Sequence, residues 1–262
     1  MSQRLASCST LPRTACTVLA VLLPALPAAA GEVLVAAAAN IAAPLQQMAA
    51  AFTADTGHTL RIASGATAKF AHQVRAGAPF QVLLAADSAT PARLLADGLA
   101  VPGSAFTYAI GRLVLWSARP GWVDADGRVL ATGQFAHLAI AQPKTAPYGA
   151  AALQVLRARH LESALAPRLV TGESVAQAWA FVHSGQAELG FVALSQISRP
   201  GLAPTGSHWL VPAALHDPIR QDAVLLLPGR EQPAALALLA WLKTPAAQNL
   251  LRGWGYETPK AP

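Results

Sequence analysis

The stretch VLVAAAANIAAPLQQMAAAF, Val33 to Phe52, contains the junction on which the fold prediction depends. It starts with a continuous apolar run, Val33 to Ala38, typical of a strand that is buried on both faces of a sheet. A helical pattern, Ile41 to Thr53, begins directly after Asn40 with no charged residue at the junction. The stretch therefore predicts a strand followed by a helix, and such a helix start can hold an anion.

The same alternation of strand-like and helical patterns continues along the chain. Further strand-like runs are Thr59 to Ile62, Gln81 to Leu84, Phe106 to Trp116, His137 to Ala141, Arg168 to Val170, Leu189 to Val192 and Asp222 to Leu227. Further helical patterns are Thr67 to Arg75, Thr90 to Leu95, Tyr148 to His160, Val175 to Ser184, Pro233 to Leu242 and Pro245 to Leu251. This order predicts an α/β fold with a mainly parallel sheet and helices on its faces.

The strand and helix units fall into two sets with no low-complexity linker between them. Extended segments near Ile110 to Arg112 and near His216 to Ala223 are the candidate crossings between the sets. We therefore expect two lobes joined by two strands, with residues 31–110 and 220–262 in the first lobe and residues 111–219 in the second.

The N-terminus has the pattern of a secretory signal peptide. Arg4 and Arg13 precede an apolar stretch from Thr17 to Pro27, and a run of small residues ends at Ala30. We expect residues 1–30 to be removed and the mature protein to be periplasmic. Both cysteines precede this cleavage site, so a mature chain of 262 − 30 = 232 residues has no disulfide or thiol chemistry.

Composition argues against several classes of function. The chain is 53% hydrophobic and 12% charged, which is enough apolar sequence for a large core. Its formal charge is +6, but the basic residues are scattered, so we expect no nucleic-acid partner. The sequence has no nucleophile, P-loop or dinucleotide motif, and no histidine pair spaced for zinc. We therefore expect no catalytic residues and no metal site.

Four strand-to-helix junctions are candidates for a binding site. They are AAAN40IAAPL, SGAT67AKF, KTAPY148GAAAL and GESV175AQAW. Asn40 and Thr67 are predicted to cap their helices, while Pro147 and Ser174 stand at the openings of the other two. Ligands of open α/β sheets gather at the carboxyl ends of strands, so we expect the four helix starts to converge on one cleft.

The donors expected at these junctions are neutral. Asn40 offers an amide NH2, Thr67 offers a hydroxyl and its own N-H, and Tyr148 and Val175 offer main-chain N-H groups. A fully ionised tetrahedral oxyanion only accepts hydrogen bonds, whereas a protonated phosphate also needs an acceptor for its own hydrogen. The set therefore favours a fully ionised oxyanion. Three nearby charged residues are expected to be solvated: Lys69, Lys144 and Glu173.

Over its mature length the sequence resembles the periplasmic molybdate-binding (ModA) proteins of ABC importers. The resemblance is carried by TGH (Thr56 to His58), GAPFQVLLAAD (Gly77 to Asp87), PGSAFTYAIGRLVLWS (Pro102 to Ser117), KTAPYG (Lys144 to Gly149), ELGFVALSQI (Glu188 to Ile197) and HDPIRQDAVLL (His216 to Leu226). It implies a two-lobed periplasmic binding protein of type II that closes by a hinge on molybdate or tungstate, without a metal or cofactor, and delivers the ion to a membrane permease. We expect a monomer.

The resemblance also implies which residues contact the anion. Matching motif to motif places the side-chain contacts of the family on Asn40 and Thr67, and its main-chain contacts on Tyr148 and Val175. Some members use a threonine just before the first of these positions, where Ala39 keeps only its N-H. Some members add a tyrosine hydroxyl, which is missing here because the matching residue is Ala193.

Three alternatives stay open at this point. The nearest is a receptor of the same fold for sulfate or another oxyanion. A second is a secreted hydrolase whose catalytic triad is assembled in space. A third is a two-lobed enzyme similar to porphobilinogen deaminase, which anchors its cofactor through a cysteine that the predicted mature chain lacks.

Overall fold

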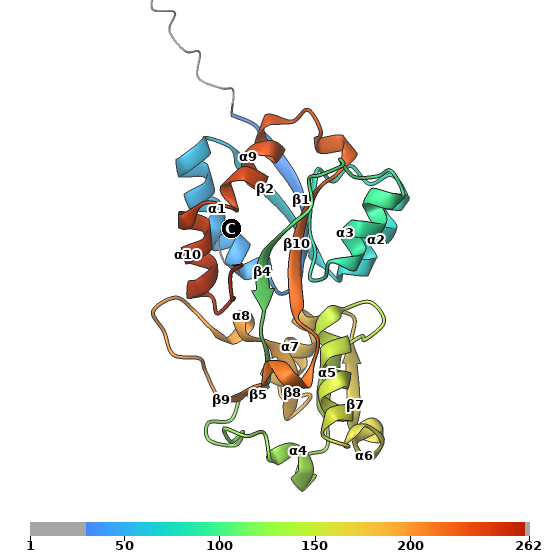
Figure 1. The fold of residues 1–262 in the computed structure, drawn as a ribbon. Coiled ribbons are helices and arrows are strands. Elements are labelled where there is room, and N and C mark those ends of the chain that lie inside the picture. The colour runs from blue at the N-terminus through green and yellow to red at the C-terminus, as the bar shows by residue number, and fades with distance from the viewer. Residues whose placement is uncertain (1–29, 260–262) are drawn as a thin grey trace, which may run out of the picture.

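The structure, a computed structural model, describes residues 30–259 and has two α/β lobes, one above the other in Figure 1. The predicted signal peptide, apart from Ala30, lies outside the described residues. Among the residues described, none of the helices is both long and apolar enough to span a bilayer.

The first sheet combines strands from both ends of the chain. Its strands are β1 (Glu32–Ala38), β2 (Thr59–Gly65), β3 (Val82–Leu84), β4 (Phe106–Gly111) and β10 (Ile219–Leu225), in the order β2-β1-β3-β10-β4. Strand β1 pairs in parallel with β2 and β3, and β10 pairs antiparallel with β3 and β4. All strands but β10 therefore run in the same direction.

The second sheet repeats this plan. Its strands are β5 (Leu113–Ser117), β6 (Leu138–Ala141), β7 (Leu169–Gly172), β8 (Leu189–Ala193) and β9 (Ser207–Leu210), in the order β7-β6-β8-β5-β9. Here β5 is the reversed strand, since it pairs antiparallel with β8 and β9, while β6 pairs in parallel with β7 and β8. The expected α/β fold with a mainly parallel sheet in each lobe is confirmed.

Helices cover both faces of each sheet. The first sheet carries α1 (Ala42–Thr56), α9 (Pro233–Trp241) and α10 (Pro245–Gly253) on one face, and α2 (Thr67–Arg75) and α3 (Ala89–Ala96) on the other. The second carries α4 (Val129–Thr132), α5 (Pro147–Ala158) and α6 (Glu162–Leu165) on one face, and α7 (Val175–His183) and α8 (Leu194–Ile197) on the other. Short 3₁₀ turns span Ala166–Arg168, Ala213–Leu215 and Leu227–Gly229.

Burial on two faces explains the apolar run that begins at Val33. Alternate residues of β1 enter different clusters: Val33 and Val35 pack beneath α1 and α9, whereas Ala36 packs with Phe70 of α2. A strand between two helical layers has no solvated face, so its sequence is continuously apolar.

The chain passes between the sheets at two places. The run from Phe106 to Trp116, predicted as one long strand, is two strands in different sheets, β4 and β5, separated by Arg112. The break lies within the segment Ile110 to Arg112 that was expected as a crossing, although the apolar residues on both sides give the pattern of one strand. The return passage is residues 211–218, since Ile219 already belongs to β10 in the first sheet. In Figure 1, β4 and β10 descend side by side to the second lobe.

Candidate functional site

A small cavity lies where strand ends of the two sheets meet. Its walls come from the segments after β1, β2 and β3 of the first sheet and after β6 and β7 of the second. The lining residues are Ala38, Ala39, Asn40, Gly65, Ala66, Thr67, Ala86, Ala146, Pro147, Tyr148, Ser174 and Val175. The volume is about 10 Å³, close to one water-sized sphere, so the cavity has room for no more than one small ion. All five predicted site residues line it.

Four main-chain N-H groups at the cavity lack an acceptor. They belong to Asn40, Thr67, Tyr148 and Val175, and none has a hydrogen-bond partner within residues 30–259. The last three lie in the first turns of α2, α5 and α7, where an N-H has no intrahelical acceptor. Unpaired buried N-H groups are rare, because each loses its hydrogen bonds to water. Four at one cavity indicate a ligand rich in acceptors.

Thr67 adds a fifth donor. Its Oγ1 accepts a hydrogen bond from the Ala86 N-H at 3.1 Å, which leaves the hydroxyl hydrogen free. The predicted capping role is wrong: the N-cap of α2 is Ala66, Thr67 is the first helical residue, and no side chain caps this helix. The hydroxyl is therefore available to a ligand beside the N-H of the same residue.

Asn40 lies at the cavity but directs its amide elsewhere. The Nδ2 donates to Gln221 Oε1 and to the Tyr256 hydroxyl, both at 2.8 Å. Both amide hydrogens are used, so the expected amide contact with an anion is not available in this structure. The predicted cap is also wrong, since the N-cap of α1 is Ile41. Asn40 offers its main-chain N-H instead.

Ala39 does not have the free N-H that was predicted. This N-H donates to the Gly65 carbonyl oxygen at 2.9 Å and extends the pairing of β1 with β2 by one residue. Ala39 therefore faces the cavity without an available main-chain donor.

A buried polar network around Asn40 was not anticipated from the sequence. The Ser195 hydroxyl and the Tyr256 hydroxyl each donate to the Asn40 carbonyl oxygen at 2.9 Å. Gln221, which holds the Asn40 amide, is itself 0% exposed and donates to the Ile219 carbonyl oxygen. One sequence feature could have indicated this network. Gln221 is a polar residue in an otherwise apolar strand, and a polar side chain that is buried there needs a hydrogen-bond partner.

The helix starts of the second lobe are built as predicted. Pro147 occupies the first position of α5, where proline loses no hydrogen bond because that N-H has no helical acceptor. Ser174 is the N-cap of α7 and accepts from the Gln177 N-H at 3.4 Å. Gln196 donates to the Val175 carbonyl oxygen at 3.1 Å and holds the start of α7 against α8.

Charged side chains stand outside the cavity. A larger cleft of about 710 Å³ shares Gly65, Ala66 and Ser174 with it, so the two spaces adjoin. Lys69 and Glu173 line this cleft, are mostly exposed, and form an ion pair of 3.9 Å between the lobes. Lys144 is exposed and lines neither space. No residue that lines the cavity carries a formal charge.

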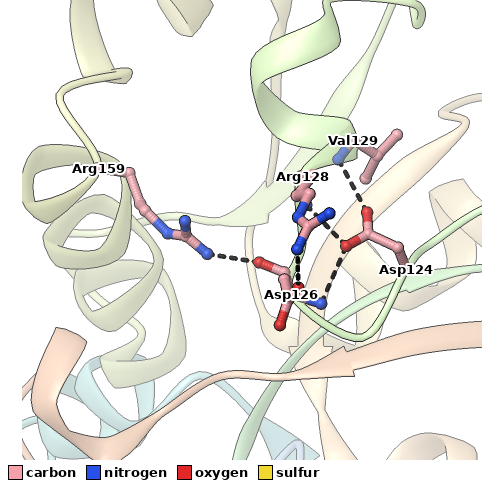
Figure 2. A network of polar contacts seen from close by, with 5 residues as sticks. All are labelled: Asp124, Asp126, Arg128, Val129 and Arg159. Atoms are coloured by element: carbon pink, nitrogen blue, oxygen red, sulfur yellow. Dashed lines mark hydrogen bonds and ion pairs between the residues drawn. The ribbon is translucent and has the colours of Figure 1, made fainter.

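Within residues 30–259 no three His, Cys, Asp or Glu side chains group as metal ligands. In the second lobe Asp124 accepts main-chain hydrogen bonds from Asp126, Arg128 and Val129 (Figure 2). Partial burial raises the pKa of Asp124, but these hydrogen bonds outweigh it and hold the pKa below its ordinary value. Both carboxylate oxygens accept hydrogen bonds from N-H groups at or just before the start of α4, so the cluster stabilises the fold.

Two mainly parallel sheets with helices on both faces and a ligand-sized cavity between their strand ends define a solute-binding protein of the periplasmic type. Residues 33–257 match the family described as "Bacterial extracellular solute-binding protein". The chain belongs to that family and, through the relatives described next, to the ModA proteins.

The relatives cover most of the chain. It is 53% identical over 229 residues to the molybdate-binding protein ModA of Azotobacter vinelandii, covering 87% of this chain and 91% of that protein. It is 52% identical over 235 residues to ModA of Rhodobacter capsulatus, covering 89% and 91% respectively. These relatives are named as binding proteins in a family of solute-binding proteins. The chain is accordingly a binding protein, and the hydrolase and deaminase alternatives fall away.

Solved structures agree on the fold. The periplasmic molybdate-binding protein of A. vinelandii superimposes with a TM-score of 0.85 at 43% identity, covering 87% of this chain and all of that one. The sulfate-binding protein SubI of Mycobacterium tuberculosis superimposes with a TM-score of 0.68 at 15% identity, covering 88% of each chain. The second likeness shows the shared fold only.

Proposed function

We propose that the protein binds molybdate or tungstate in the periplasm and delivers it to the membrane permease of an ABC importer. One observation carries the proposal: four main-chain N-H groups and the Thr67 hydroxyl, none of which has an acceptor among the described residues, surround a cavity that no charged residue lines. The names of the two ModA relatives at 53% and 52% identity support the choice of ion and the link to transport.

The donor set suits a tetrahedral dianion. Such an ion offers only acceptors, and the N-H groups of Thr67, Tyr148 and Val175 also bring the positive ends of three helix dipoles to it. A formal positive charge is not needed at the site. Hydrogen phosphate would bring a hydrogen of its own, which this set of donors does not accept.

Selection against sulfate is a matter of size, because sulfate offers the same acceptors as molybdate. A shell of donors set for the larger ion leaves some oxygens of a smaller ion out of hydrogen-bond range. Each unmade bond in a dry site costs roughly 1–3 kcal/mol. One missed contact therefore corresponds to about a tenfold preference.

Capture requires the lobes to part and close. We propose that the ion first meets the donors of Asn40 and Thr67 in the first lobe, after which the second lobe brings in Tyr148 and Val175. The hinge is formed by Arg112 and residues 211–218, where the chain passes between the sheets. The moving units are those predicted, residues 31–110 with 220–262 and residues 111–219, except that Gly111 in β4 and Ile219 in β10 belong to the first sheet and move with the first lobe. The receptor is a monomer, uses no cofactor, and is exported by a signal peptide of residues 1–30.

Isothermal titration of the mature protein with molybdate, tungstate, sulfate and phosphate tests the proposal. We expect one-to-one binding of molybdate and tungstate, with sulfate at least about tenfold weaker and phosphate weaker still. Equal affinity for sulfate would make the protein a general receptor for tetrahedral dianions. Binding of none of the four ions would overturn the proposal.

A further inference from the structure

Helix α8 lies at the boundary between the lobes (Figure 1) and contacts both of them. The N-H of Leu194, its first residue, donates to the carbonyl oxygen of Arg112 in the hinge at 2.9 Å. The Leu194 side chain also packs beneath Gly255, where a Cβ would lie 2.8 Å from Leu194 Cδ2. The Arg199 guanidinium, two residues after α8, lies 4.9 Å from the centre of the Trp254 ring. Gly255 and Trp254 belong to the C-terminal segment of the first lobe, so α8 follows β8 of the second lobe and packs on the first.

Two consecutive side chains of α8 hold residues that donate to the ion cavity. The Ser195 hydroxyl, on a residue only 3% exposed, donates to the Asn40 carbonyl oxygen at 2.9 Å across the two lobes. The Gln196 amide donates to the Val175 carbonyl oxygen at 3.1 Å within the second lobe. Asn40 and Val175 each direct a main-chain N-H without an acceptor to the cavity. One short helix therefore binds the main chain of an ion donor from each lobe.

The sequence leaves the Asn40 carbonyl oxygen free for this contact. Helix α1 begins at Ala42, and the residue four positions after Asn40 is Pro44, which has no N-H to donate. Within the described residues no main-chain N-H donates to this oxygen. Its donors are the hydroxyls of Ser195 and Tyr256, each at 2.9 Å, and these two hydroxyls lie 3.1 Å apart. Tyr256 packs in the core of the first lobe, so Ser195 is the donor that arrives with the second.

We propose that Ser195 is a positioning residue that sets the size of the ion cage, an inference that rests on the proposed function. As the lobes close, its hydroxyl meets the Asn40 carbonyl oxygen and fixes the N-H of Asn40 at a set distance from that of Val175. The two oxygens are then in hydrogen-bond contact at 2.9 Å, so the lobes have little room to approach further around a smaller ion. The same bond thus stabilises the closed form and limits the closure.

The substitution Ser195→Ala tests this inference. It removes the hydroxyl, and the Asn40 carbonyl oxygen keeps Tyr256 as a donor, so no buried acceptor is left unpaired. We expect the Kd for molybdate in isothermal titration to rise about tenfold, mainly through a faster koff, as for the loss of one hydrogen bond. The Kd for sulfate, measured by competition with molybdate, should rise less, because the space left by the oxygen lets the lobes approach the smaller ion. The preference for molybdate over sulfate should therefore narrow.

Ser207→Ala is the matched control. Ser207 is a second buried serine of the second lobe, in β9. Its hydroxyl donates to the Arg119 carbonyl oxygen at 2.6 Å and accepts from the N-H groups of Trp122 and Val123. All of these partners lie in the second lobe. The substitution should lower the Tm and leave the Kd for molybdate and the Kd for sulfate as in the wild type, since it touches no contact between the lobes.

The outcomes separate this inference from the proposed function. If Ser195→Ala binds molybdate as the wild type does, or weakens molybdate and sulfate by the same factor, the inference is wrong. Equal losses of affinity in Ser195→Ala and Ser207→Ala would also overturn it, because a general loss of stability would then explain both. If the wild type binds no oxyanion, it is the proposed function that fails.

Discussion

The two lobes share a strand order but provide different kinds of donor. Each sheet has one reversed strand in the fourth place, β10 in one and β5 in the other. The first lobe contributes a hydroxyl, on Thr67, together with main-chain N-H groups, whereas the second lobe contributes main-chain N-H groups alone. In the second lobe the backbone at a helix start is what the ligand meets.

This difference determines which substitutions can reveal the site. A side-chain change at Thr67 removes a donor directly. At Val175 most side chains keep the donor, because the N-H belongs to the main chain. Proline is the exception, and it is tolerated at the first position of a helix, which Val175 occupies.

Val175→Pro should therefore have the largest effect on binding. It deletes one N-H to a charged ligand, worth roughly 1.5–3 kcal/mol, so the affinity for molybdate should fall about 10- to 100-fold by titration calorimetry. Ser174 already has an extended conformation, with φ −142° and ψ 168°, which suits a residue before proline. Val175→Ala keeps the N-H and should bind within about threefold of the wild type. Unchanged binding by the proline variant would remove Val175 from the site.

Sequence reasoning located the helix starts of the second lobe because their determinants are local. Pro147 at the first position of α5 and Ser174 at the N-cap of α7 act within one turn of their own helices. The apolar run of β1 was equally readable, since burial on both faces leaves a continuous pattern.

The role of the Asn40 amide could not be predicted in the same way. Its partners Gln221 and Tyr256 are 181 and 216 residues away in the sequence, and the topology alone brings them together. The strand boundary between β4 and β5 was only partly readable. The change of sheet falls at Arg112, inside the segment Ile110 to Arg112 that was expected as a crossing, but Gly111 and Leu113 are both buried and the run from Phe106 to Trp116 has the pattern of one strand.

Thr67→Val tests the side-chain donor of the first lobe and should have the second-largest effect. The shape is kept and the hydroxyl is lost, while the main-chain N-H of residue 67 remains. We expect about a tenfold loss of affinity for molybdate. The free energy of unfolding, measured by urea denaturation, should fall by roughly 1–3 kcal/mol, because the Ala86 N-H loses its acceptor.

Thr67→Ser serves as the control, since it keeps the hydroxyl. It should bind within about threefold of the wild type. If the valine variant binds as the wild type does, the Thr67 hydroxyl is not a ligand donor, and the contrast between the lobes disappears.

Lys69→Gln should have only a small effect on affinity. Lys69 is mostly exposed, and its ion pair with Glu173 at 3.9 Å lies in the outer cleft. Exposed pairs of this kind contribute about 0.2–1 kcal/mol. We expect a change of about fivefold or less in Kd, which corresponds to the upper end of that range, and a smaller change at high salt, where screening is stronger. A loss as large as that of Val175→Pro would mean that formal charge holds the ion.

Asp124→Asn should leave binding unchanged and alter only the acid stability of the second lobe. The folded pKa of Asp124 is lowered, so its carboxylate stabilises the fold above the ordinary pKa of about 3.9. This contribution is lost as the pH falls through the folded pKa. The Tm of the wild type should be higher than that of the variant near pH 6, and this difference in Tm should shrink towards pH 3. A difference independent of pH would assign the effect to something other than ionisation.

The most direct test of a site built by both lobes is a crystal structure of the mature protein with tungstate, in which anomalous scattering locates the ion. We predict the ion in the cavity between the lobes, with the N-H groups of Asn40, Thr67, Tyr148 and Val175 and the Thr67 hydroxyl within hydrogen-bond distance of its oxygens. An ion bound instead in the outer cleft, against Lys69, or held by one lobe alone, would contradict a cage of neutral donors drawn from both lobes.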